Sequence, residues 1–222
     1  MHYSILDTGG SRSFPDEHAL LAGAAKDLKS AEVVIVLGEH AGKHAKSLKK
    51  WKDKAAVLIE LGTESLGVYT GESRAEEGSN VLGFARFGLG NAEPTNLVEL
   101  VRQPRTGDAA IAAAKQVMEG AGLQVAVCGD FAGRIIDRLV RPYYNAALRR
   151  LDEGLATADD LDTTLRLGLG YPEGPIALLE RTGLAQHFDV TQALHEATGE
   201  QAYAPARRAR VAKARTVTVK LA

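Results

Sequence analysis

Two glycine-containing segments that follow strand-like runs are the first candidates for chemistry, because such loops can bind nucleotide phosphates. A dinucleotide-binding domain carries G-x-G-x-x-G after its first strand, so that the pyrophosphate can approach the backbone. Residues 7–18, DTGGSRSFPDEH, have two adjacent glycines and lack that spacing. Residues 38–43, GEHAGK, resemble a phosphate loop, but three residues instead of four separate the glycines, and His44 follows Lys43. We therefore expect a turn into a helix at 38–43.

The remaining reactive side chains favour ordinary structural roles. His40 and His44 are four residues apart and would share one face of a helix, a spacing used by zinc sites. No third ligand is suggested, so we predict no metal site. Cys128 ends an apolar run and is better explained as a small core residue than as a nucleophile. The basic tail at 207–220 could hold a phosphate group, but a solvated helix face explains it better.

Strand-like and helix-like segments alternate over the first part of the chain. Helical patterns cover 15–29, 43–54 and 108–122. Apolar runs that are typical of buried strands occur at 3–6, 32–38, 55–62, 80–87, 96–102 and 123–129. This alternation predicts a mostly parallel sheet with helices on its faces.

The pattern changes to helices after Asp130. A helical stripe covers 131–154, in which Pro142 should produce a kink. Further helices are predicted, one capped by Thr157 and one that starts at Pro175. A helix over 184–198 and a weak strand over 216–221 complete the prediction. We expect an α/β domain over 1–129 and a helical domain over 130–222.

Composition narrows the class of protein. Hydrophobic residues make up 45% of the 222 residues and charged residues 25%, a balance typical of globular proteins. The net charge of −1 gives no support to nucleic-acid binding. Cys128 is the single cysteine, which excludes an intrachain disulfide and fits a cytoplasmic location. No apolar run approaches the roughly 20 residues of a membrane helix, and the N-terminus does not resemble a secretory signal.

The glycine- and proline-rich segment GLGYPEGP at 168–175 belongs to a longer pattern. Residues 133–184 run from GRIIDRLVRPYY through the acidic helix start to this segment. In that order they resemble the C-terminal domain of 3-hydroxyacyl-CoA dehydrogenases. A weaker resemblance extends upstream to about residue 31. It implies an NAD-dependent oxidoreductase of fatty-acid metabolism, built from a Rossmann-like domain and a helical domain of the kind found at the C-terminus of 6-phosphogluconate dehydrogenase. It also implies a homodimer formed through the helical domain and an acyl-CoA ligand.

The family resemblance identifies site residues and departures from the family pattern. Glu99 in LVEL matches the family glutamate that orients the catalytic histidine, whereas the histidine position falls at Ala85 or Phe87. Asp137 stands where the family has an asparagine that contacts substrate. Ser65, or its neighbour Glu64, matches a substrate hydrogen-bond donor. The glycine fingerprint is missing, and the nucleotide-binding part is shorter by about one βαβ unit. We therefore expect a truncated, doubly wound Rossmann-like domain.

These losses lead to three hypotheses about function. The first is a catalytically impaired dehydrogenase, a pseudoenzyme that binds NAD weakly or not at all and retains acyl-CoA binding. The second is an active NAD-dependent enzyme with a rearranged site, in which Glu99 or a histidine such as His187 acts as the base. The third is a non-catalytic partner that dimerises with an active paralogue through residues 131–199.

Overall fold

The computed structural model of the chain describes residues 1–71 and 79–220, without the side chains of 45–49 and 217–220. Contacts within the chain divide it into two compact units. The first consists of Met1–Phe87 and Pro94–Arg134, and the second of Gly88–Glu93 and Ile135–Ala222.

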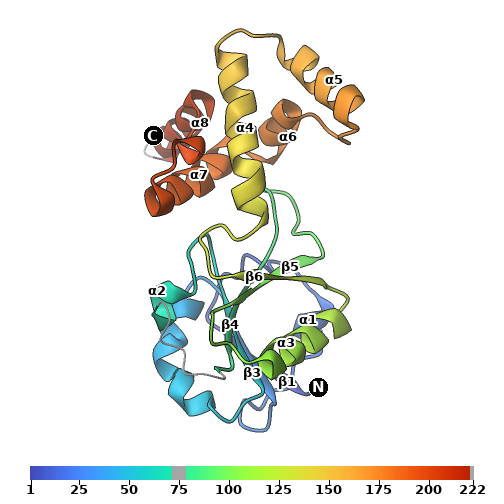
Figure 1. Cartoon of the computed structure of the whole chain (residues 1–222), viewed down its shortest axis with the longest axis vertical. Coiled ribbons are helices and arrows are strands. Elements are labelled where there is room, and N and C mark those ends of the chain that lie inside the picture. The colour runs from blue at the N-terminus through green and yellow to red at the C-terminus, as the bar shows by residue number, and fades with distance from the viewer. Residues whose placement is uncertain (72–78, 221–222) are drawn as a thin grey trace. The chain divides into compact units, whose positions relative to one another are not determined.

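The first unit is an α/β domain with one sheet among its described residues (Figure 1). Its strands are β1 (Tyr3–Asp7), β2 (Val33–Leu37), β3 (Ala56–Glu60), β4 (Val81–Arg86), β5 (Leu97–Arg102) and β6 (Gln124–Gly129). Their order in the sheet follows the chain, and β4–β5 is the one antiparallel pair among them. Its helices are α1 (Ala19–Ala22), the 3₁₀ helix η1 (Ala41–Trp51), α2 (Gly67–Thr70) and α3 (Asp108–Gly120).

Apolar residues on both faces of the strands bury the sheet between two hydrophobic clusters. Val33, Ile35 and Leu37 of β2 pack on the face that α1 and α3 cover. Val34 and Val36 point to the opposite face, where side chains of η1 and its neighbours lie. Because alternate residues of a strand point to opposite faces, the continuous apolar run of β2 fills both clusters. The predicted mostly parallel sheet, covered on both faces, is confirmed.

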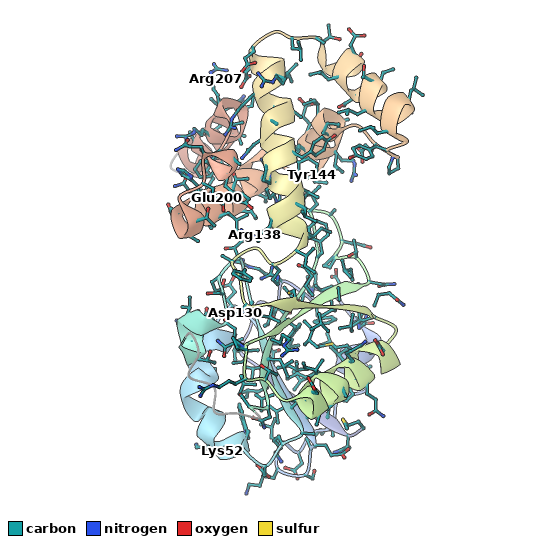
Figure 2. All side chains as sticks on the ribbon, in the orientation of Figure 1. Lys52, Asp130, Arg138, Tyr144, Glu200 and Arg207 are labelled. Carbon is teal, nitrogen blue, oxygen red and sulfur yellow. The ribbon has the colours of Figure 1, made fainter. Side chains whose placement is uncertain are left out.

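Helices make up the second unit. They are α4 (Ile136–Asp152), α5 (Ala158–Leu169), α6 (Pro175–Thr182), α7 (Leu184–Thr198), the 3₁₀ helix η2 (Gln201–Tyr203) and α8 (Arg207–Lys220). Its core contains Leu148, Ile176, Leu179 and Ala206, and Tyr144 of α4 packs against this core (Figure 2).

The glycine- and proline-rich segment is the tight connection between α5 and α6. Gly170 ends α5 in the left-handed conformation, at φ 70°. Pro175 occupies the first turn of α6, where its missing N–H costs nothing. Asp162 accepts hydrogen bonds from the N–H groups of Ile176 and Ala177 at 2.9 and 2.8 Å. Asp162 of α5 thereby caps the start of α6. Thr157 caps α5, as predicted, by accepting a hydrogen bond from Asp160 N–H at 3.1 Å.

Two predicted elements are wrong, and a third is a helix of another type. The helix expected over 15–29 is confined to α1, because the His18 side chain caps Leu20 N–H and the Ala25 N–H bonds to Tyr3 of β1. The segment 43–54 forms a 3₁₀ helix over 41–51, in which residues four apart do not share a face. The strand predicted over 216–221 is helical as far as Lys220, and Leu221 lies outside the described residues.

Candidate functional site

Glu99 of β5 forms a buried ion pair with an arginine. Its Oε2 lies 3.3 Å from Nε of Arg134, and the two side chains are 3% and 6% exposed. The apolar strand LVELVR places this carboxylate in the interior, because its neighbours Val98 and Leu100 are fully buried. The partner of Glu99 that the structure identifies is therefore a permanent cation, which cannot accept a proton at neutral pH.

The strand register places Ala85 opposite Glu99. β4 and β5 are antiparallel, and Ala85 is the residue directly across from Glu99. Residues in such a pair point to the same face of the sheet, so the Ala85 methyl group lies beside the carboxylate. Phe87 lies beyond the end of β4, where its N–H bonds to Leu97. Of the two positions that the sequence left open, Ala85 is the neighbour of Glu99.

Arg134 is held in an unusual backbone conformation. Its φ is 52°, and it is the non-glycine residue with positive φ in the described part of the chain. Its Nη1 is buried and has no hydrogen-bond partner among the described groups. The N–H of Gly133 bonds to Thr63 at 2.8 Å and anchors the turn before it. A strained, buried cation of this kind persists only where its surroundings fix it.

Cys128 lies near this ion pair and is not activated. Burial, and then the nearby carboxylate of Glu99, raise the pKa of its thiol to about 11. The thiol therefore stays protonated at neutral pH, which is the state of an inert cysteine.

The loop after β3 contains Ser65 and Glu64. Glu64 accepts hydrogen bonds from Gly62 N–H at 3.1 Å and from the Tyr69 hydroxyl at 2.9 Å. Burial and the bond to Glu64 raise the pKa of Tyr69 to about 12. Ser65 is half-buried and its carbonyl accepts from Val68 N–H. This loop leads into α2.

Asp130 fixes the start of α2 (Figure 2). Its carboxylate accepts from the N–H groups of Leu66 and Gly67 at 2.6 and 2.7 Å, and from Gln103 Nε2 at 3.0 Å. This contact joins the loop after β3 to the end of β6.

Asp137 lies in the second unit, whereas Glu99 and Ser65 belong to the first. Its Oδ1 accepts from Arg141 Nε at 2.7 Å, one turn along α4. The Arg141 side chain is 2% exposed. A buried cation of the same unit therefore balances the negative charge of Asp137, which the family's asparagine does not carry.

The Arg141 guanidinium also contacts His187, with Nη1 3.0 Å from Nδ1. Since a guanidinium only donates, Nδ1 accepts, and Nε2 carries the proton that bonds to Asn145 Oδ1 at 3.1 Å. Burial, and then the Arg141 charge, lower the pKa of His187 to about 3. His187 is therefore neutral, engaged on both nitrogens, and a weak base.

A cavity of about 160 Å³ opens where β1, β2 and β3 end. Three carboxylates and one guanidinium line it, those of Glu39, Glu60, Glu64 and Arg12. This position is the carboxyl edge of the parallel strands, where open α/β sheets bind their ligands. The cavity is smaller than the roughly 300–1,000 Å³ typical of pockets for drug-sized ligands.

Sequence reasoning did not identify Arg134, Arg141 or Glu60. The available signals were an acidic residue at the end of the buried run AVLIE and basic residues near Gly133 and Pro142. The partners of these charged residues depend on the tertiary contacts between elements, which the sequence does not show.

Comparison with known proteins gives a consistent result. Residues 133–220 match the family described as 3-hydroxyacyl-CoA dehydrogenase, C-terminal domain. The chain is 37% identical over 109 residues to a 3-hydroxybutyryl-CoA dehydrogenase of Bradyrhizobium diazoefficiens, covering 49% of this chain and 37% of that protein. A 3-hydroxybutyryl-CoA dehydrogenase of Mycobacterium tuberculosis is 32% identical over 154 residues, covering 69% and 53%. The matches thus span about half, or less, of these relatives.

Solved structures support the same fold. The (S)-3-hydroxybutyryl-CoA dehydrogenase of Ralstonia eutropha superposes with a TM-score of 0.70 at 24% identity, covering 85% of this chain and 67% of that one. The 3-hydroxybutyryl-CoA dehydrogenase of Escherichia coli gives 0.69 at 25% identity, covering 84% and 41%. The described residues include no helix with the length and apolar character needed to cross a membrane.

Proposed function

Because the chain belongs to the 3-hydroxyacyl-CoA dehydrogenase family as a divergent member, we propose that it keeps acyl-CoA binding while hydride transfer is impaired. The observation that carries this proposal is the pairing of Glu99 with Arg134, opposite Ala85. The Glu99 carboxylate thus pairs with a guanidinium, and the residue across from it is an alanine where the family resemblance places the catalytic histidine. General-base catalysis is worth about 10²–10⁴-fold in rate, so its loss alone would make turnover very slow.

NAD is the cofactor that the family implies, and the residues at the strand ends do not fit it. The carboxylate of Glu60 accepts the hydrogen bonds of Ser13 N–H and Gly38 N–H, groups suited to a pyrophosphate. The carboxylates of Glu39 and Glu64 add negative charge to the same cavity. In addition, the strand order of the described sheet does not reverse, so the crevice of a dinucleotide-binding sheet has no counterpart there. We propose that NAD binds weakly or not at all.

Binding and turnover measured separately test this function. Thermal unfolding is followed with NADH, with acetoacetyl-CoA, and with neither, and NADH oxidation is followed with both present. The proposal predicts a rise in Tm with the CoA ester alone and NADH oxidation at least about 100-fold below ordinary rates of about 10 s⁻¹. Turnover at ordinary rates would contradict it and favour an active, rearranged site. No response to either ligand would favour a non-catalytic partner.

The helical unit supports a second proposal, that the chain forms a homodimer. Leu167 and Leu169 of α5 are 81% and 64% exposed, and Leu155 before this helix is 66% exposed. Large exposed apolar side chains on a helix that buries none of its own residues within this chain are typical of an interaction surface. Light scattering after gel filtration should report a dimer that Leu167→Asp dissociates. Ala112→Asp, at an exposed position of α3 in the other unit, serves as the control for an added surface charge. A monomeric wild-type protein would contradict the proposal.

We also propose that the chain acts in fatty-acid metabolism in the cytoplasm. It rests on the family and on the single cysteine, Cys128. Fractionation of the source cells with an antibody to the chain tests the location.

A further inference from the structure

A buried carboxylate of the protein occupies the edge where parallel α/β sheets bind anionic ligands. Glu60 is the last residue of β3 and is 5% exposed. Its Oε1 accepts from Ser13 N–H at 2.7 Å and from the Ser11 hydroxyl at 3.0 Å. Its Oε2 accepts from Gly38 N–H at 2.6 Å. Donors from the loops after β1 and β2 therefore bind both oxygens.

The two loops are shaped to direct these donors inward. Gly38 has a φ of 107°, and a Cβ there would overlap the carbonyl oxygen of Gly9, so a side chain is excluded. The pairing of β1 with β2 continues beyond the strands, because Thr8 N–H bonds to Leu37 at 2.8 Å and Glu39 N–H bonds to Gly9 at 2.9 Å. Backbone N–H groups that converge in this way at strand ends form anion-binding concavities.

We infer that Ser13 N–H, Gly38 N–H and the Ser11 hydroxyl form an oxyanion site that the protein fills with its own Glu60. Carboxylate and phosphate oxygens are both anionic acceptors of charge-assisted hydrogen bonds, so one excludes the other. The inference rests on the proposed weakness of NAD binding and names its cause. The phosphate site has not been lost, but it is closed by an internal anion. Removal of Glu60 should open it to inorganic phosphate or pyrophosphate.

The experiment compares Glu60→Ala with the wild-type chain and with Glu39→Ala. Glu39 lines the same cavity on its exposed rim, so its removal changes the local charge without freeing these donors. Tm is measured in sodium phosphate, sodium pyrophosphate and sodium chloride at equal ionic strength. Glu60→Ala should gain about 5–10 °C at a phosphate concentration about 100 times its Kd. The wild-type chain and Glu39→Ala should respond to phosphate as they do to chloride.

A second variant keeps the test informative if Glu60→Ala folds poorly. Far-UV circular dichroism would then show whether phosphate, and not chloride, restores its helix content. Glu60→Gln keeps the site filled but sets an NH₂ group against a backbone donor, so its Tm should fall and phosphate should not restore it.

Two results would overturn the inference. One is a Glu60→Ala protein on which phosphate has no effect, and the other is an equal phosphate effect on Glu60→Gln or Glu39→Ala. Tight NADH binding by the wild-type chain would instead contradict the proposed function. That titration is run separately, so the two failures can be told apart.

Discussion

The buried pair of Glu99 and Arg134 allows a quantitative prediction. Replacing Arg134 by methionine keeps an unbranched, flexible side chain on the strained backbone, but removes the cation that lies 3.3 Å from the Glu99 carboxylate. Because the two side chains are only 3% and 6% exposed, water cannot replace the lost cation without local opening. Breaking a buried pair on one side costs about 3–5 kcal/mol.

This free energy translates into a large thermal shift. For a chain of 150–250 residues, 1 kcal/mol corresponds to about 2–4 °C, so Arg134→Met should lower Tm by about 6–20 °C. Urea unfolding followed by circular dichroism gives the same quantity as a free energy. The double variant Glu99→Leu with Arg134→Met removes both charges, and we expect it to recover most of the loss.

A surface pair provides the matched control. Lys115 and Glu119 are 3.5 Å apart, one turn along α3, with side chains 40% and 49% exposed. Lys115→Met should cost less than about 1 kcal/mol, because water screens such pairs. If Arg134→Met costs no more than this control, or if the double variant is less stable than Arg134→Met, the reasoning about a buried, mutually dependent pair is refuted.

Further predictions concern the helical unit. The lowered pKa of His187, about 3, means that the unfolded chain, with a histidine pKa near 6.5, binds more protons between these values. The resulting stability is fully present above about pH 6.5 and decreases as pH falls, by about 2 kcal/mol at pH 5. Urea unfolding as a function of pH should show this decrease in the free energy of unfolding. The variant His187→Asn should remove the decrease, and His40→Asn, at an exposed position, should retain it. Asp162→Ala removes two hydrogen bonds to the start of α6 and should cost about 1–3 kcal/mol in urea unfolding. Thr157→Ala should cost about 1 kcal/mol by the same measurement, and Thr157→Ser much less, because serine also caps helices.

Each of these predictions has a clear contrary outcome. An unchanged pH slope in His187→Asn would place the titrating group elsewhere. A loss in Asp162→Ala no greater than that of an exposed substitution such as Thr163→Ala would mean that the bonds to α6 contribute no stability. Equal losses in Thr157→Ala and Thr157→Ser would assign the effect to packing instead of capping.

The sequence by itself determined the elements whose signals are local. The apolar run 33–37 has no polar position and therefore requires burial on both faces, as found. Thr157 and Pro175 predicted the starts of two helices correctly, because capping depends on residues within one turn. The dense pattern at 133–184 predicted the family, and the match over 133–220 confirms it.

Tertiary contacts decided what local signals could not. The segment 216–220 is rich in β-branched residues, yet it continues α8, which Arg208 and Lys213 anchor to Asp152 and Asp189. Register also lay beyond the sequence, because the position opposite Glu99 depends on how two strands pair, and one residue of slip would change the answer.

The partners of the charged residues were likewise decided by the fold. Glu60 and Ser13 are 47 residues apart, and Glu99 and Arg134 are 35 apart. The sequence supplies these charges but not their distances. Only the assembled sheet and its loops determine that Glu60 binds backbone donors and that Glu99 binds a buried guanidinium. A buried charge is stable only with a partner, and the fold decides which partner lies beside it.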